Sequence, residues 1–271
     1  MPKLSLSTLV LTLSSATLLL IACYWFIIDG RTLARPEIRS GYLLLAIMLL
    51  PALLGVRKRL SVIPLGTVHG WTRVHVVFGA LLLPLFWLHL GGFWPDGIYE
   101  QILAALFYLV TAGGFAGWLM QKRIPNRLVQ AGNEVIFERI PEEIIECRRE
   151  VEHLILEYQK ETGSDTLAKH YVDILSWYFF KPRFRINHLF SGEAHEHWLR
   201  GKYRIIERYL APDEKKYLRR LADIARRKAD LDFHYTHQGL LKLWLFLHVP
   251  LAAALVVFSM WHLLLVHLYS I

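Results

Sequence analysis

Four histidines lie in two strongly apolar stretches of the sequence, where their type and spacing could support metal chemistry. His75 and His89 lie in one stretch, His248 and His262 lie in the other, and each pair is 14 residues apart. In an α-helix this interval makes about 3.9 turns, so both histidines of a pair project from nearly the same face, roughly 21 Å apart along the axis. Neutral imidazole is a common metal ligand. The spacing predicts two ligand positions on each helix, one toward each side of a bilayer about 30 Å thick.

The order of the apolar segments predicts which histidines face each other. One further apolar segment separates the two histidine-bearing ones, so these two helices run in the same direction through a membrane. His75 should then lie at the depth of His248. His89 should lie at the depth of His262. Two facing imidazoles at each depth are suited to hold two haem b groups as axial ligands, with the macrocycle filling apolar space. Histidines in membrane helices can instead be interior residues satisfied by hydrogen bonds, although ionisable residues there are rare and usually functional.

Five apolar segments could position these histidines. Crossing the hydrocarbon core takes about 20 apolar residues in a helix, and the candidates are residues 9–28, 41–56, 74–93, 102–120 and 243–268. The first segment contains Leu20-Ile21-Ala22-Cys23, which is similar to a lipoprotein signal. Its apolar run continues beyond Cys23, which favours an ordinary membrane helix.

The charged residues are concentrated in one part of the chain. Residues 121–240 hold 22 of the 31 Lys and Arg and 19 of the 23 Asp and Glu, and this distribution excludes a simple soluble enzyme and a disordered chain. It predicts an all-α membrane protein, a bundle of about five transmembrane helices with a helical insert between helices four and five. The expected domains are residues 1–120 with helices one to four, the polar insert at 121–240, and helix five at 241–271.

Turn and capping residues predict helices within the insert. Ile140-Pro141-Glu142-Glu143 suits a first helical turn, with proline at the start and acids beside the positive end of the helix dipole. Ser164 and Asp165 can cap a second helix. Residues 211–214, Ala-Pro-Asp-Glu, open a third.

Basic residues in the short loops predict the orientation. Arg57-Lys58-Arg59 follows the second segment and Lys122, Arg123 and Arg127 follow the fourth, whereas residues 90–101 contain no Lys or Arg. We therefore expect the N-terminus and the insert in the cytoplasm and residues 90–101 outside, in a bacterial cytoplasmic membrane. Three arginines in the first loop oppose this orientation and are outnumbered: Arg31, Arg35 and Arg39. The net charge of +8 suits the lipid bilayer with its anionic head groups better than nucleic acid.

A resemblance to a known family is carried by two stretches, HGWTRVHVVFGALLLPLFWLHLGG and LWLFLHVPLAAALVVFSMWHLLLVH. They resemble the diheme membrane cytochromes b, and in particular the transmembrane haem domain of the ferric reductase and NADPH oxidase family. The resemblance covers under a quarter of the chain and implies that His75, His89, His248 and His262 are the haem iron ligands. The family's flavin domain does not occur in this sequence, and no Cys-x-x-Cys-His motif for covalent haem is present. The resemblance therefore implies a cytochrome subunit that relays electrons across the membrane between redox protein subunits, rather than a stand-alone enzyme.

Weaker signals surround the four histidines. Arg73 and Lys242 lie at the inner ends of the histidine-bearing segments, where they could pair with haem propionates or anchor to lipid head groups. Gly79, one turn from His75, could admit a haem face or aid helix packing. Glycines 113 and 117 form a GxxxG pattern that favours a close helix contact. The tryptophans, Trp244 among them, are interpreted mostly as interfacial or packing aromatics.

Three other functions fit the sequence. A quinol-oxidising or quinone-reducing cytochrome subunit would use His69 or His237, which could also ligate a third haem or be interfacial residues with ordinary hydrogen bonds. A proton or metal transporter would use the histidines without haem, but such proteins usually carry Asp or Glu within their spans, and the five segments contain none. An assembly or scaffold protein would use the insert and need no cofactor.

Overall fold

The chain is all-helical over the residues that the structure describes. A computed structural model describes residues 36–59, 67–130, 135–190 and 193–269, with a few isolated residues between 14 and 24. Helix makes up 88% of the structure, and no strand occurs among the described residues, so the predicted all-α class is confirmed. The chain divides into two compact units. The first unit consists of Met1–Leu119 with Trp244–Ile271, and the second of Met120–Leu243.

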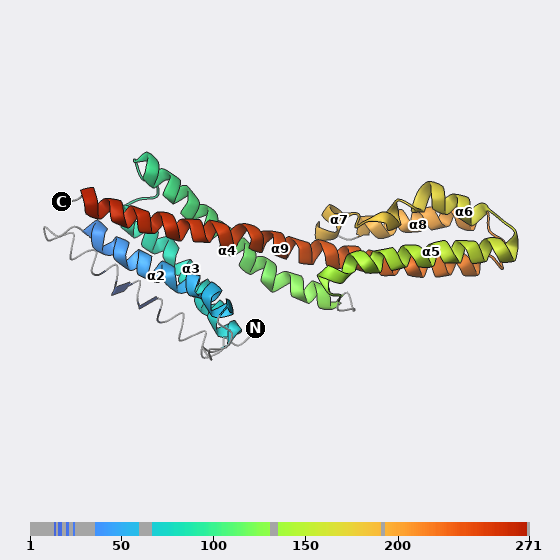
Figure 1. Cartoon of the computed structure of the whole chain (residues 1–271), viewed down its shortest axis with the longest axis horizontal. Coiled ribbons are helices and arrows are strands. Elements are labelled where there is room, and N and C mark those ends of the chain that lie inside the picture. Colours follow the sequence, from blue (N-terminus) through green and yellow to red (C-terminus); the bar gives the residue numbers. More distant parts are fainter. Residues whose placement is uncertain are drawn as a thin grey trace. The chain divides into compact units, whose positions relative to one another are not determined.

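Among the described residues, four helices contribute to the first unit (Figure 1). They are α2 (Pro36–Arg59), α3 (Val68–Leu90), most of α4 (Ile98–Gln130) and the last part of α9 (Lys215–Tyr269). Helix α2 packs along α3. All four helices contribute to a small apolar core, made of Ile47, Met48, Leu81, Leu82, Leu85, Phe86, Ala104, Phe107 and Leu255.

In the part of the chain that the structure describes, three helices, α3, α4 and α9, are long and apolar enough to cross a membrane. Only 22%, 17% and 6% of the most apolar stretch of α3, α4 and α9, respectively, is buried. Most of this apolar surface therefore faces outward, as it does in a bundle that contacts lipid. The prediction of five spans is not confirmed. The second predicted span lies in α2, whose apolar run Ile38–Leu53 is shorter, and the first, residues 9–28 with Cys23, lies almost wholly outside the described residues.

Helix α3, which carries His75 and His89, has well-defined ends. The side chain of Thr67 caps its start and accepts a hydrogen bond from the backbone N–H of Gly70 at 3.1 Å, which satisfies a donor that the helix leaves open. Gly91 follows the last turn with a φ of 63°, a left-handed conformation that glycine adopts without steric cost. The caps set the length of α3, so that His75 lies about two turns from its start and His89 in its last turn.

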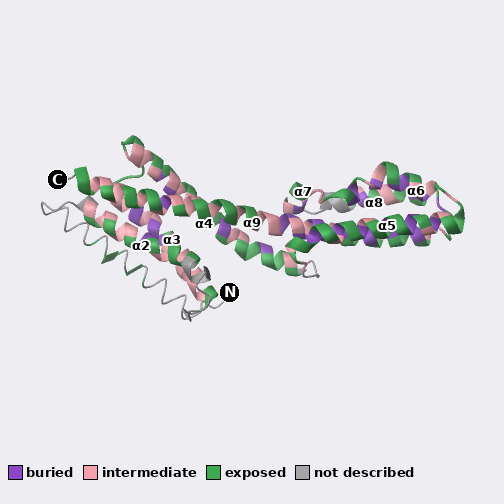
Figure 2. Cartoon of the chain, viewed as in Figure 1, coloured by how far each residue is buried: buried purple, intermediate pink, exposed green. Residues whose placement is uncertain are grey.

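The second unit has its own helices and its own core. Besides the end of α4 and the first part of α9, it contains α5 (Ile140–Thr162), α6 (Thr166–His170), α7 (Arg185–Phe190) and α8 (Glu193–Glu207). Short 3-10 or π-helical stretches cover Phe137–Arg139, Tyr171–Leu175 and Tyr178–Phe180. Helix α5 begins at Ile140 with Pro141 in its first turn, as predicted. Figure 2 shows buried residues along α5, and the largest fully buried side chains of this core include Tyr158, Tyr178, Phe179 and Tyr217.

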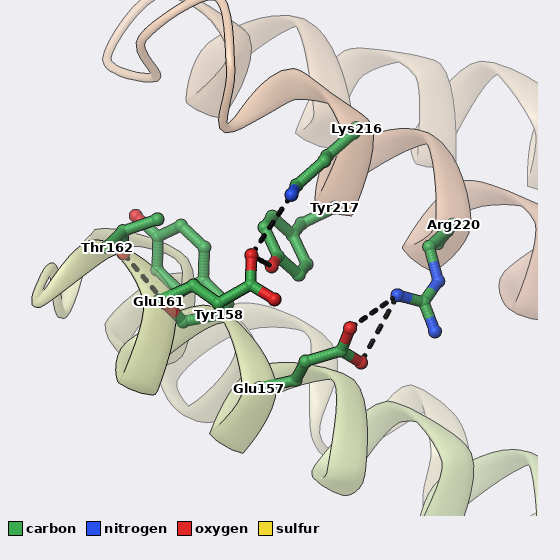
Figure 3. A network of polar contacts seen from close by, with 7 residues as sticks. All are labelled: Glu157, Tyr158, Glu161, Thr162, Lys216, Tyr217 and Arg220. Carbon is green, nitrogen blue, oxygen red and sulfur yellow. Dashed lines mark hydrogen bonds and ion pairs between the residues drawn. The ribbon is translucent and has the colours of Figure 1, made fainter.

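Helix α9 runs without interruption through 55 residues. Its first part pairs with α5 through the polar contacts drawn in Figure 3. The guanidinium of Arg220 donates to both carboxylate oxygens of Glu157, at 3.0 and 3.2 Å. Glu161 accepts hydrogen bonds from Lys216, at 3.0 Å, and from the hydroxyl of Tyr217. These contacts fix the pairing of the two helices more than they add stability, because exposed ion pairs contribute at most about 1 kcal/mol.

Candidate functional site

The structure brings His75 of α3 and His248 of α9 together. Their ring centres are 6.4 Å apart and their planes are inclined at 73°. Two imidazoles bonded through one nitrogen each to a single metal ion have ring centres roughly 6 Å apart, because each metal–nitrogen bond is about 2 Å long. The separation of the two rings therefore matches that of two axial ligands of one iron.

The ring of His75 is held through one nitrogen and leaves the other for a ligand. Its Nδ1 lies 3.0 Å from the backbone carbonyl oxygen of Pro51 in α2. A carbonyl oxygen only accepts hydrogen bonds, so Nδ1 is the donor, and in the neutral imidazole the lone pair is then on Nε2. Metal-ligating histidines commonly donate their second ring nitrogen to a carbonyl, which fixes the orientation of the ring. The carbonyl of Pro51 serves this purpose for His75.

Two glycines of α4 lie against His248. A Cβ added at Gly113 would lie 3.4 Å from the Nδ1 of His248, and one added at Gly114 would lie 3.6 Å from its Cε1. On its own helix, the imidazole stacks on the indole of Trp244, with ring centres 5.3 Å apart and planes inclined at 18°. His248 is thus enclosed by the glycine face of α4 and by an aromatic ring one turn away.

His89 and His262 line one apolar cavity of about 300 Å³. Helices α2, α3, α4 and α9 all contribute to its walls, which are mostly apolar and include Leu44, Met48, Phe86, Phe107 and Leu255. The volume is at the lower end of the range of about 300–1,000 Å³ that small-molecule sites cover. The second predicted pair therefore shares a cavity with the dimensions and lining of a ligand site.

Neighbouring helices orient the two histidines of this cavity. The Nδ1 of His89 lies 3.1 Å from the hydroxyl of Ser40, and a Cβ added at Gly41 would lie only 3.0 Å from its Cε1. The ring of His262 stacks on Tyr99, with centres 6.0 Å apart and planes inclined at 19°. Each ring is thus positioned by a residue from another helix.

The same cavity is lined by a carboxylate that the sequence placed outside the spans. Helix α4 begins at Ile98, so Glu100 lies in its first turn, just before the predicted span of residues 102–120, which contains no Asp or Glu. The carboxylate lies so close to Gly97 that a Cβ at this position would overlap it. The start of α4 ahead of the predicted span therefore brings a carboxylate to this cavity.

The weaker candidates are placed as follows. The ammonium of Lys242 pairs with Glu138 and lies 4.1 Å from the centre of the Phe137 ring, so its charge is engaged within the second unit. Arg73 is half-buried in α3. A Cβ added at Gly79 would meet no atom within 4 Å.

The two histidines considered for a quinone or a third haem differ in burial. His69 is exposed in the first turn of α3. His237 belongs to the second unit and is 1% exposed. Its Nδ1–H donates to the carbonyl of Phe233 at 3.0 Å, so its Nε2 keeps a lone pair.

Three further histidines are buried in the second unit, His170, His188 and His234. The Nε2 atoms of His170, His234 and His237 are buried and have no hydrogen-bond partner among the described residues. Burial lowers the pKa of each of the three imidazoles, because the charged ring would lose its hydration. These histidines therefore favour the neutral form.

The two histidine pairs fit haem in the donors they offer. A haem iron takes its equatorial ligands from the porphyrin and needs only an axial pair from the protein. His75 and His248 have the separation of such a pair, and His89 and His262 share an apolar cavity. Within the described ranges, no group of three or more His, Cys, Asp or Glu could hold a bare metal ion.

The chain was compared with protein-family models, with curated proteins and with solved structures, and none of them matches it. Function is therefore inferred from the residues of the two histidine pairs and their surroundings.

Proposed function

We propose that the chain is a diheme membrane cytochrome b subunit that relays electrons across a membrane between redox partner proteins. The observation that carries the proposal is the meeting of His75 and His248, with ring centres 6.4 Å apart, on two long apolar helices. Polar groups are costly in an apolar bundle unless their hydrogen-bonding or ligating atoms are used. Axial ligation uses both rings, and the carbonyl of Pro51 satisfies the second nitrogen of His75.

The second pair supports a second haem in the same bundle. His75 and His248 would hold one haem iron, and His89 and His262, which line the apolar cavity, would hold the other. Haem supplies reversible one-electron chemistry, and its potential depends on axial ligands, hydrogen bonds and burial. The 14-residue interval on each helix corresponds to about 21 Å, which suits transfer from one side of a membrane to the other.

The chain's own residues would orient the ligands and keep water out. The carbonyl of Pro51 fixes His75, and Ser40 contacts His89. The ring of Tyr99 stacks on His262 while its hydroxyl donates to the carbonyl of Phe258 at 2.8 Å. Apolar walls from four helices surround His89 and His262, the outer pair. These walls lower the local dielectric constant, which strengthens nearby charge interactions.

Exposed apolar side chains support membrane insertion. Phe246, Val257 and Leu268 on α9 are 75%, 65% and 62% exposed, and apolar surface of this extent suits lipid. The basic loops favour a cytoplasmic second unit in a bacterial cytoplasmic membrane. Redox partner subunits would bind on one or both sides.

Single histidine substitutions test the proposal. The inner haem is the one held by His75 and His248, and the outer haem is the one held by His89 and His262. We expect purified full-length protein to lose the inner haem in His75→Ala and His248→Ala, and the outer haem in His89→Ala and His262→Ala. Pyridine haemochrome assays should then give about one haem per chain instead of two. His267→Ala is the matched control, because His267 is exposed on α9 and its Nε2 only accepts a hydrogen bond from Tyr42. Haem content that is unchanged in all four variants would refute the proposal.

A second candidate is a quinol-oxidising or quinone-reducing cytochrome subunit, and Glu100 favours it. This carboxylate lines the outer cavity beside His89 and His262, and carboxylate and imidazole are suitable proton acceptors for a hydroquinone. The cavity would then bind the quinone, and only the inner pair would hold haem. One haem per chain, unaffected by His89→Ala and His262→Ala, would favour this candidate over the diheme one.

A further inference from the structure

Trp244 makes three contacts that fix its indole beside His248. Its Nε1–H donates to the backbone carbonyl of Gly113 in α4 at 2.8 Å. Its ring lies against Gly117, one turn further along α4, so closely that a Cβ at Gly117 would overlap the indole at Cζ2. Its ring also stacks on the imidazole of His248, with planes inclined at 18°. The absence of a side chain at Gly117 therefore provides a slot on α4 for the indole ring.

The two inner histidines are oriented by different means. His75 donates its Nδ1–H to the carbonyl of Pro51. The Nδ1 of His248 is buried and has no hydrogen-bond partner among the described residues. Without such a bond, the orientation of a histidine ring depends on packing, because its second torsion is broad and roughly two-fold. For His248 this packing is provided by the glycines of α4 and by Trp244.

We propose that Trp244 is the positioning residue of the inner haem site and sets the ring plane of His248. This inference rests on the proposed diheme function. Trp244 lies one helical turn before His248, on the same face of α9, and α4 holds its indole through a hydrogen bond and a glycine slot. The 73° between the planes of His75 and His248 thus depends on a residue that would not itself contact the iron.

The test compares variants that move the indole with variants that leave it in place. Trp244→Leu removes the stack and the hydrogen bond, Trp244→Phe keeps an aromatic ring but removes the hydrogen bond, and Gly117→Ala displaces the indole without altering it. Gly55→Ala is the glycine control, because Gly55 lies on α2 and a Cβ at this position would meet no atom within 4 Å. Trp261→Leu is the tryptophan control, since Trp261 is 52% exposed on α9.

Three readouts are measured on the full chain in detergent: haem per chain, the midpoint potential of each haem, and the low-spin electron paramagnetic resonance signal. The shape of this signal depends on the angle between the two axial imidazole planes. Loss of an outer-shell partner commonly weakens metal binding roughly 10–100-fold. We expect Trp244→Leu and Gly117→Ala to change the inner signal and potential and to weaken inner haem retention by this order. Trp244→Phe should change the signal less, and both controls should match the wild type.

The outcomes separate this inference from the proposed function. A wild-type chain with two haems whose inner signal and potential are the same in Trp244→Phe, Trp244→Leu and Gly117→Ala would overturn the role of Trp244 and leave the diheme function standing. A wild-type chain without haem would overturn both. If Trp244→Leu does not accumulate in membranes, the milder Trp244→Phe and Gly117→Ala decide.

Discussion

At Gly41, an added side chain would crowd His89, one of the two histidines of the proposed outer haem site. A Cβ at Gly41 would lie 3.0 Å from the Cε1 of His89, which is closer than ordinary carbon contacts of about 3.5–4.0 Å. We expect Gly41→Ala to push the His89 ring out of position and to lower outer haem occupancy, so that haem per chain falls from two toward one. The inner haem should be unaffected, because His75 and His248 do not contact Gly41.

Gly55→Ala is the matched control for this prediction. Gly55 lies on the same helix, α2, and a Cβ at Gly55 would meet no atom within 4 Å. The number of haems per chain and the reduced-minus-oxidised spectrum are measured for both variants. Equal haem content in Gly41→Ala and Gly55→Ala would contradict a close contact between α2 and the outer ligand.

Spacing within one helix could be read from the sequence, and contacts from other helices could not. The equal intervals predicted which histidines would share a level, and the structure brings His75 to His248. The interval between Trp244 and His248 also places them on one face, so their stacking was foreseeable. The carbonyl of Pro51 and the hydroxyl of Ser40 carry no such signal, because their roles depend on how α2 packs against α3.

At the scale of elements, α9 is the main departure from the sequence prediction. The sequence was divided at residue 240 because the charge density falls there, but helix formation does not require a change of direction where polarity changes. Between Lys215 and Val249 there is no proline, and Gly239 is the only glycine. A single glycine reduces the stability of a helix by only about 1 kcal/mol relative to alanine. One helix of 55 residues therefore spans the predicted boundary.

Acid should destabilise the helices of the second unit. Burial lowers the pKa of His170, His234 and His237, so at and below their ordinary pKa of about 6.5 the unfolded chain binds more protons than the folded one. Their contribution to stability is therefore lost as the pH falls through this value and down to the lowered folded-state pKa. Burial raises the pKa of Asp230 and that of Asp232, the latter to about 6, which acts in the opposite direction but involves two carboxyls against three imidazoles. We expect thermal unfolding of the full chain, followed by circular dichroism, to occur a few degrees lower at about pH 5 than at about pH 7.5.

Substituting a buried histidine isolates its share of this effect. His234→Gln cannot titrate, so its unfolding temperature should differ less between the two pH values than that of the wild type, whatever its stability at neutral pH. His153→Gln is the control, because His153 is exposed. An identical acid shift in His234→Gln and the wild type would show that His234 does not contribute.

For the whole molecule, the class could be predicted and the number of spans could not. Charge and hydropathy predicted an all-helical chain, which the described residues confirm. Within the described ranges, three helices have the length and hydropathy of a membrane span. The apolar run of α2 among the described residues, Ile38–Leu53, is shorter than these three. Whether such a segment crosses or only partly enters a membrane depends on its neighbours and on lipid thickness.

The proposed orientation predicts which parts of the molecule are accessible from outside the cell. In a Cys23→Ser background, Asp96→Cys in the loop between α3 and α4 should react with an impermeant maleimide in intact cells. Lys160→Cys on α5 should react only after permeabilisation; both positions are exposed. Native Cys147 should stay unlabelled, because it is buried and burial raises the pKa of its thiol to about 11. Labelling of Lys160→Cys in intact cells would show that the orientation is the opposite of the proposed one.

The most direct test of the diheme proposal is the haem content of the wild-type chain. Full-length protein is purified from membranes in detergent, and its reduced-minus-oxidised spectrum is recorded together with a pyridine haemochrome assay. The proposal predicts a b-type α-band and about two non-covalent haems per chain. A colourless protein with no α-band would contradict it.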